Sequence, residues 1–476
     1  MEACLRCGFR EVPLLGPVNP GPLGMLRKPE ETSSPAHPAA ATIAARLDGA
    51  PFCRLRLAIL CVMTLALFAD IAEVALGNAL GAVFQAPPRS MTRAEVSVFL
   101  AAIFAGGAAG APIFGLLGDR TGRRLALQLA LLVIAAGSFG AAASDGPVAL
   151  IGFRFLSGLG IGACPPLIAA YLADVMPPRW RGALICICAG LAFLGAPGII
   201  FLMRATSPSF LGLEGWRWAL GSGSLLAIIA AGLLLLLPES PRWLAAAGRI
   251  AEAEAALRRF GVSGAEAAIA PRAAMPPAAA PDDSDQISLH RRFVLLCTLY
   301  ALSPWATIGF LLMSGAVMLK KHFSLGDSVV AAGLIMFGPV IGNLLMALVI
   351  DRIDRKASLV ATAIAMALLG LSFAAATEFL PLVTIGVAFA FCSAIYASVL
   401  GVYAAEIIPT AQRSSRTALA WGIGRFVSIF VPLVFFALLH RFGPWAMFGL
   451  IAAAIGLSAL LVVTIGPQGR TRRPVA

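Results

Sequence analysis

The chain has 476 residues, of which 59% are hydrophobic and 13% charged, and its formal net charge is +12. A soluble protein of this length carries roughly twice that charged fraction, whereas here apolar runs of about 20 residues, long enough to cross a bilayer, recur along most of the chain. The composition therefore excludes a soluble globular protein, and the continuous rather than alternating runs exclude a membrane β-barrel.

Residues 1–53 are rich in Pro, Ala and Gly without periodicity, and we expect a disordered cytoplasmic tail, with Met25 as a second candidate start. The runs that follow predict an all-α membrane protein with twelve transmembrane helices. The predicted spans are 57–84, 95–117, 124–143, 148–173, 182–204, 217–237, 293–318, 328–350, 357–376, 380–405, 416–439 and 444–465.

These spans form two halves, 54–237 and 293–466, each with six helices. The central loop, 238–292, contains a short amphipathic segment from Arg249 to Phe260 that is typical of a helix at a membrane surface. Residues 467–476 form a short tail.

Two stretches of the chain repeat at one spacing. A tight basic turn joins two apolar runs at 115–124 and again at 350–356, an offset of 232 residues (351 − 119). Asp174 and Glu406, each near the end of an apolar run, have the same offset (406 − 174). A shared offset at separate landmarks predicts tandem copies of one membrane unit.

The distribution of arginines predicts the orientation. Basic residues gather in the even-numbered loops and are sparse in the odd ones, so the even loops and both termini are expected in the cytoplasm. This placement also argues against nucleic acid as the partner of the positive charge. We expect a multi-pass protein of the inner or plasma membrane.

Several motifs resemble those of the major facilitator superfamily. Gly115–Arg124 fits its signature G-x-L-x-D-R-x-G-R-R at every position, and Arg154–Gly158 fits the R-x-x-x-G pattern of its fourth span. Pro238–Leu244 resembles the sugar-porter and organic-ion branches. Asp70 and Glu73 map onto the D-G-[YF]-D pattern of the aromatic-acid and metabolite:proton symporters. The resemblance implies two six-helix halves related by a pseudo-two-fold axis and secondary active transport.

Departures from these patterns concern the substrate. Glu73 replaces the second Asp of the symporter pattern, span seven lacks the glutamine pair of sugar porters, and 466–469 keeps only part of their P-E-T-K-G motif. These differences count against a sugar substrate.

Ionisable residues inside a span are costly, by at least about 2.5 kcal/mol at the bilayer centre, and therefore indicate function. Asp70 and Glu73 are three residues apart and share a helix face, and Arg154 reaches a similar depth in its own span. We predict that these three couple transport to protons. The alternative is a structural ion cluster that holds the N-terminal half together.

Arg425 is the only ionisable side chain deep within a span of the second half. A lone guanidinium near the midplane suits bidentate capture of a carboxylate, although it could instead pair with a carbonyl or carboxylate of the protein. The other predicted substrate-binding residues are Asn78, Trp305, Phe310, Asn343, Tyr396 and Trp421. Helix packing is the alternative role for the aromatic residues, and contact between helices for the asparagines.

Acids and arginines in the basic loops are expected to pair as latches between spans, Asp119 with Arg123 and Asp174 with Arg181, and to release when the access state changes. Orientation by positive charge alone is the alternative, but it does not explain the acids. The predicted latch residues are Asp119, Arg120, Arg123, Arg124, Asp174, Arg181, Glu239, Arg242, Asp351, Arg352, Arg355, Glu406 and Arg413.

Together these features predict proton-coupled symport of a small organic, carboxylated metabolite by alternating access, by a monomer in the lipid bilayer. A proton antiporter that exports drugs or metabolites is one alternative, based on the partial motif Gly195–Gly198, and a receptor or scaffold that does not transport is another. The chain has no Walker sequence, no HExxH motif and few histidines, so we expect no enzyme activity, metal or cofactor.

Overall fold

The computed structural model describes residues 38–84, 91–262, 283–350, 352–408 and 413–467. Within them, twelve helical segments are long and apolar enough to cross a bilayer, which confirms the predicted class and places each span within a few residues of its predicted position. Asp351 and most of the C-terminal tail lie outside the described residues, as do the side chains of Asn78 and Arg413.

The first half consists of α2 (Arg54–Val83), α3 (Arg93–Thr121), α4 (Arg123–Ala143), α5 (Pro147–Ile161) with α6 (Cys164–Val175), α7 (Arg181–Ala192) with α8 (Gly195–Ala205), and α9 (Gly215–Leu234). A short hairpin, β1 (Ser209–Phe210) and β2 (Leu213–Glu214), precedes α9. The second half consists of α12 (Asp283–Thr307) with α13 (Gly309–Lys320), α14 (Leu325–Ile335) with α15 (Phe337–Val349), α16 (Arg355–Ala375), α17 (Phe379–Ile407), α18 (Arg413–Ser428) with α19 (Phe430–Phe442), and α20 (Pro444–Thr464).

Proline explains why several spans consist of two helices. A proline has no N–H to donate to the carbonyl four residues earlier, so the helix is interrupted there. Pro165, Pro339 and Pro432 each lie four residues after the last residue of α5, α14 and α18 respectively. The positions of these prolines in the sequence therefore account for the interruptions in these spans.

Paired glycines set the helix packing in both halves. A Cβ at Gly110 would lie 1.8 Å from the carbonyl oxygen of Leu159, and a Cβ at Gly342 would lie 2.9 Å from that of Phe391. Both distances are too short for any side chain, so α3 must pack on α5, and α15 on α17, through glycine. The two contacts are equivalent, because both the glycines (342 − 110) and the carbonyls (391 − 159) are 232 residues apart.

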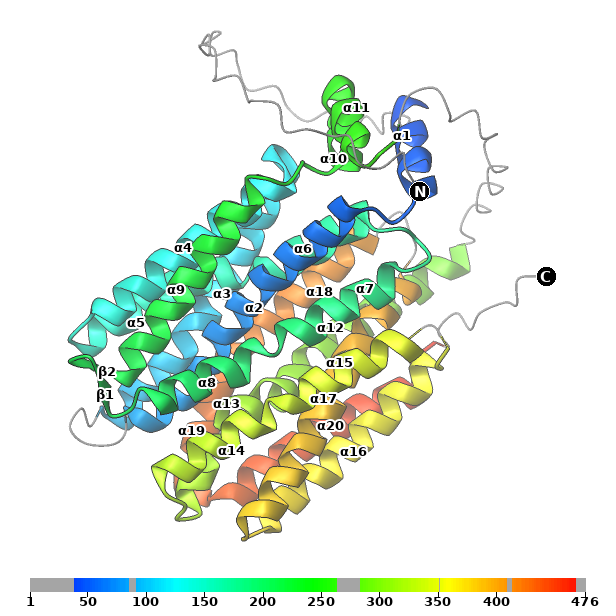
Figure 1. Ribbon diagram of the computed structural model, residues 1–476. Helices are drawn as coiled ribbons and strands as arrows, with labels where there is room; N and C mark the ends of the chain where they lie inside the picture. The colour runs from blue at the N-terminus through cyan, green and yellow to red at the C-terminus, as the bar shows by residue number, and fades with distance from the viewer. Residues whose placement is uncertain (1–37, 85–90, 263–282, 351, 409–412, 468–476) are drawn as a thin grey trace, which may run out of the picture.

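The two halves lie side by side, the first drawn from blue to green and the second from yellow-green to red (Figure 1). They meet where α7 packs on α15, α8 on α14, α13 on α2, and α3 on α18 and α19. We call the end at which α2 begins the terminal side, and the end that carries β1 and β2 the distal side.

Three further helices cover the terminal side of the first half: α1 (Pro38–Gly49), α10 (Pro241–Ala246) and α11 (Ile250–Arg259) (Figure 1). Ile43 of α1 is buried against Leu244 and Ala253 of α10 and α11. The predicted disordered tail of residues 1–53 is therefore wrong over 38–49, because an apolar face of that segment finds a partner in the central loop. The amphipathic segment of the central loop forms α11.

Candidate functional site

A cavity of about 370 Å³ lies between the two halves. Residues of α2, α3, α6, α7 and α8 line it from the first half, and residues of α12, α13, α15, α17 and α18 line it from the second. The lining is mostly apolar with a few polar side chains, and the volume lies within the range of small-ligand sites.

Asp70 on α2 and Arg425 on α18 are the only charged side chains among the described residues that line this cavity. They interact electrostatically, yet no ion pair within 4.0 Å joins Asp70 to a described residue. Asp70 is 3% exposed and its Oδ1 has no hydrogen-bond partner, and neither has Nε of Arg425. Among the described residues, each half thus supplies to the cavity one charge that forms no ion pair within 4.0 Å.

Glu73 and Arg154 form a separate pair. Arg154 Nη1 lies 2.8 Å from Glu73 Oε2, and Nη2 donates to the Glu73 carbonyl oxygen at 3.1 Å. The guanidinium lies over the ring of Phe99, 5.4 Å from its centroid. Both charged side chains are almost completely buried, and neither lines the cavity. The structure therefore divides the predicted coupling trio into a cavity residue, Asp70, and a sealed ion pair.

Breaking that pair is expected to destabilise the protein. Arg154→Met leaves the Glu73 carboxylate buried without its partner, which costs about 3–5 kcal/mol. The purified protein should melt at a clearly lower temperature, and the double variant Glu73→Gln, Arg154→Met should recover most of the loss because it carries no charge there. An Arg154→Met variant as stable as wild type would show that the ion pair contributes nothing.

Trp421 and Asn343, two of the predicted substrate-binding residues, line the cavity. The Arg425 guanidinium lies 4.9 Å from the centre of the Trp421 ring, and the indole N–H of Trp421 has no hydrogen-bond partner. Tyr300 packs against the same indole edge-on, with ring centres 6.0 Å apart. Arg425 and Trp421 thus form one corner of the cavity, which holds hydrogen-bond donors.

The structure places the other predicted aromatic residues elsewhere. Trp305 packs on Phe435, and Phe310 stacks on Phe389 at 4.1 Å. The Tyr396 hydroxyl is 2.6 Å from that of Ser458, inside the second half. These three lie behind the cavity wall, because apolar spans bury rings between helices as readily as they present them to a cavity.

Several lining residues were not predicted. The missed polar ones are Tyr300, Ser303, Thr307, Ser393, Ser398 and Ser428. A signal was present for α12, because Tyr300, Ser303 and Thr307 follow the three- and four-residue spacing of one helix face. Short hydroxyl side chains in a span are common, so that spacing alone does not indicate a cavity.

The family model of the Sugar (and other) transporter family matches residues 68–468. The chain belongs to this family of major facilitator superfamily transporters. It is 28% identical to YyaJ of Bacillus subtilis, a candidate metabolite transport protein, over 90% of this chain and 96% of that one. It is also 28% identical to the arabinose-proton symporter of Bacillus subtilis, over 78% of this chain and 84% of that one.

The fold of this transporter is that of a solved sugar transporter. The xylose transporter XylE from E. coli, in a partially occluded inward-open conformation, superimposes with a TM-score of 0.72. The two share 19% sequence identity, over 88% of this chain and 100% of that one. At that identity the likeness establishes the architecture, in which the cavity lies between two six-helix halves.

The basic loops of this transporter contain two equivalent ion pairs. Arg123 Nη1 lies 3.0 Å from Asp174 Oδ2, and Arg355 Nε lies 3.2 Å from Glu406 Oε1. The two arginines are 232 residues apart (355 − 123), and so are the two acids (406 − 174). Each pair joins the basic turn of its half to the end of the fourth span of that half. The pairing differs from the expected one, since Asp174 contacts Arg123 rather than Arg181.

Four further latch candidates differ in their exposure. Asp119, Arg120 and Arg352 have exposed side chains, and Trp243 donates to the backbone oxygen of Asp119 at 3.2 Å. Glu239 is enclosed and accepts from the backbone N–H of Arg124 at 3.0 Å. Burial raises the pKa of Glu239, and the backbone N–H groups of Ser240 and Arg124 oppose that rise. The contacts of these residues thus lie within a half or join it to the central loop.

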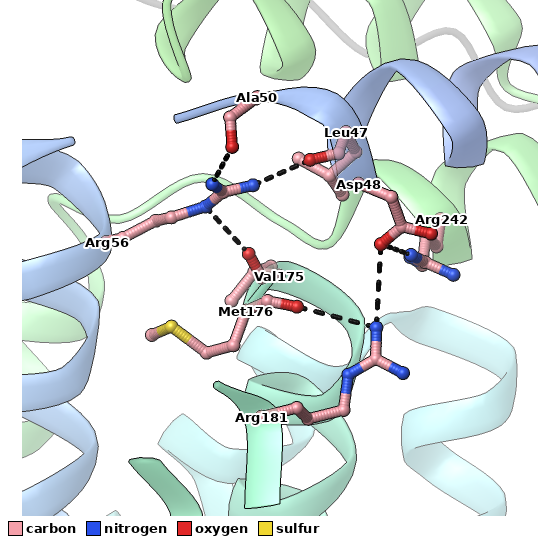
Figure 2. Close-up of polar contacts among 8 residues, drawn as sticks. All are labelled: Leu47, Asp48, Ala50, Arg56, Val175, Met176, Arg181 and Arg242. Carbon is pink, nitrogen blue, oxygen red and sulfur yellow. Dashed lines mark hydrogen bonds and ion pairs between the residues drawn. The ribbon is translucent and has the colours of Figure 1, made fainter. Parts of the chain in front are cut away.

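Asp48, at the end of α1, is an unpredicted member of this network. It pairs with both Arg181 of α7, at 3.6 Å, and Arg242 of α10 (Figure 2). Next to it, the buried Arg56 donates to backbone oxygens of Leu47, Ala50 and Pro51, and to that of Val175 at 3.0 Å. Together these bonds fix the C-terminal end of α1 to α2, α6, α7 and α10.

Asp48→Asn is expected to loosen α1 without unfolding the transporter. Asp48 and its arginine partners are a quarter to a third exposed, and such ion pairs contribute about 1 kcal/mol or less each. Hydrogen exchange should therefore accelerate by roughly three- to tenfold at the backbone amides of α1. Asp145→Asn, which removes an exposed carboxylate paired with Arg217 on the distal side, is the control. Unchanged exchange in Asp48→Asn would contradict a role of Asp48 in holding α1.

Proposed function

We propose that the protein is a proton-coupled symporter of a small carboxylated metabolite that works by alternating access in the cell membrane. The observation that carries this proposal is the pair of opposite charges in the cavity, Asp70 from one half and Arg425 from the other. In the proposed scheme Asp70 binds the proton and Arg425 binds the substrate carboxylate. Both termini face the cytoplasm in this scheme.

Charge balance provides the coupling. In the empty cavity, ionised Asp70 and Arg425 compensate each other across the interface between the halves. When a carboxylate binds Arg425, a second negative charge enters, and a proton on Asp70 restores neutrality. The empty and the fully loaded states are thus both neutral, whereas either half-loaded state leaves one charge unbalanced in a low-dielectric site. Only the neutral states reorient readily, which links one proton to one carboxylate.

The relatives support the coupling ion more than the substrate. The arabinose-proton symporter and the solved proton:xylose symporter XylE are both named for a proton as the coupling ion and for a neutral sugar as the substrate. Symport of a sugar is therefore the second candidate function. Arg425 favours the carboxylate, because a guanidinium at the cavity wall is poorly compensated by hydroxyl groups alone.

The partial antiporter motif at residues 195–198 has a packing explanation. A Cβ at Gly195 would lie 2.5 Å from the carbonyl oxygen of Phe68. The contact between α8 and α2 accounts for this glycine of the partial motif 195–198 without any role in export.

The test is uptake into proteoliposomes with an imposed proton gradient, acid outside. Symport predicts that an organic acid accumulates inside and that a protonophore abolishes the accumulation. Export of the solute from the vesicles as protons enter them would support antiport. Saturable binding with neither accumulation nor counterflow would contradict transport.

A further inference from the structure

Several polar side chains of the cavity wall present mainly acceptors to a ligand. On α12 and α18, three hydroxyl groups donate their hydrogens to the backbone of their own helix. Ser303 donates to the Tyr300 oxygen at 3.4 Å, Thr307 to that of Ser303 at 2.9 Å, and Ser428 to that of Gly424 at 2.8 Å. Each hydroxyl oxygen therefore retains lone pairs and has no hydrogen left to donate.

Asn343 and Ser398 also keep the capacity to accept, although the Asn343 amide nitrogen has a second hydrogen to donate. The Asn343 amide nitrogen donates to the backbone oxygen of Pro339 at 2.9 Å, and its Oδ1 accepts from the Ser398 hydroxyl at 3.0 Å. The amide oxygen and the hydroxyl oxygen both retain capacity to accept. We call the five residues with this property the acceptor wall; they are Ser303, Thr307, Asn343, Ser398 and Ser428.

Two donors of the cavity lie together at the Arg425 corner. The Trp421 indole N–H and Nε of Arg425 are buried and have no hydrogen-bond partner. A buried donor without a partner costs about 1–3 kcal/mol, so an acceptor brought by a ligand would be stabilised there. The cavity thus has a cationic donor corner on α18 and a wall of acceptors on α12, α15 and α17, which Ser428 of α18 joins.

From this division we infer that the substrate is a polyhydroxylated carboxylate, the class of the aldonic and uronic acids. Its carboxylate binds at Arg425 with Trp421 beside it, and its hydroxyl groups donate to the acceptor wall. A neutral sugar matches the wall but leaves the cation of Arg425 without an anion. An alkyl carboxylate matches Arg425 but buries the acceptors unpaired. The inference rests on the proposed symport and specifies its substrate.

The first experiment compares matched ligands. Proton-driven uptake and competition are measured for D-gluconate, D-galactonate and D-glucuronate, for the neutral sugars D-glucose and D-galactose, and for hexanoate, which has the charge without hydroxyl groups. At least one hydroxylated acid should bind tenfold or more tightly than its parent sugar and than hexanoate.

Each other outcome has a distinct meaning. If hexanoate follows the proton gradient and binds as well as every hydroxylated acid, the substrate class is wrong and the proposed symport stands. If a neutral sugar is the best substrate, both the class and the carboxylate of the proposed function are wrong. If no compound follows the gradient, the proposed function itself fails.

A matched pair of variants tests the acceptor wall. Thr307→Val keeps the shape of the side chain and removes its oxygen from the cavity, whereas Thr298→Val makes the same change on α12 outside the cavity. Thr307→Val should raise KM for the best hydroxylated acid roughly three- to tenfold and leave the inhibition constant of hexanoate unchanged. Thr298→Val should change neither. An equal loss for both ligands in Thr307→Val would indicate a structural role and overturn the assignment.

Discussion

Replacing Asp70 by Asn is expected to abolish net proton-driven uptake while exchange of substrate across the membrane continues. The amide resembles a protonated carboxyl group in shape and charge, so Arg425 stays available and the loaded protein remains neutral. The empty protein, however, must return with the Arg425 cation unbalanced. A charge at this depth costs at least about 2.5 kcal/mol, which slows the return step by nearly two orders of magnitude.

Two assays in the same proteoliposomes separate these steps. Net uptake driven by a proton gradient should fall by roughly fiftyfold or more in Asp70→Asn, whereas counterflow, which omits the empty return, should stay within a few-fold of wild type. Asp145→Asn on the distal surface serves as the control for the loss of one carboxylate. Accumulation in Asp70→Asn that follows the gradient as in wild type would remove Asp70 from proton coupling.

Replacing Arg425 by Gln should strongly weaken recognition of the carboxylate. A hydrogen bond to a charged group contributes about 1.5–3 kcal/mol, so KM for the acid should rise roughly 10- to 150-fold. Arg425→Lys keeps the charge but loses the planar fork and its contact with the Trp421 ring, 4.9 Å away in the wild type. We expect it to bind the acid with intermediate affinity.

The control for Arg425 lies on the same helix. Arg416 of α18 stacks over Phe293 outside the cavity, with 5.1 Å between the guanidinium carbon and the ring centre. Arg416→Gln should leave KM unchanged. If Arg425→Gln binds the acid as tightly as wild type, the carboxylate is held elsewhere and the charge-balance scheme is wrong.

The comparison of Asp70 with Glu73 shows where sequence reasoning reached its limit. Three residues of an α-helix turn the side chain by about 300°, so the two acids share a broad face but point about 60° apart. Depth along the span follows from counting residues, and it grouped both acids with Arg154. Which acid meets the cavity and which meets α5 depends on how α2 is rotated against its neighbours.

The ion pairs of the basic loops also separate what the sequence predicted from what the packing decided. The 232-residue offset identified Asp174 and Glu406 as equivalent, and the structure gives each of them the equivalent arginine, Arg123 and Arg355. The partner predicted for Asp174 was Arg181, which contacts Asp48 instead. Asp48 belongs to a segment whose composition predicted disorder, so its role depended on a docking surface made by the central loop.

The sequence alone determined the membrane class, the number and position of the spans and the internal repeat, because each depends on local composition or on a fixed spacing along the chain. Only the tertiary structure brought Asp70 and Arg425, 355 residues apart (425 − 70), to one cavity and separated both from the sealed pair of Glu73 and Arg154. The physical reason is that hydrophobic spans specify burial in the bilayer, whereas the rotation of each helix is set by close packing against neighbours that are distant in the chain.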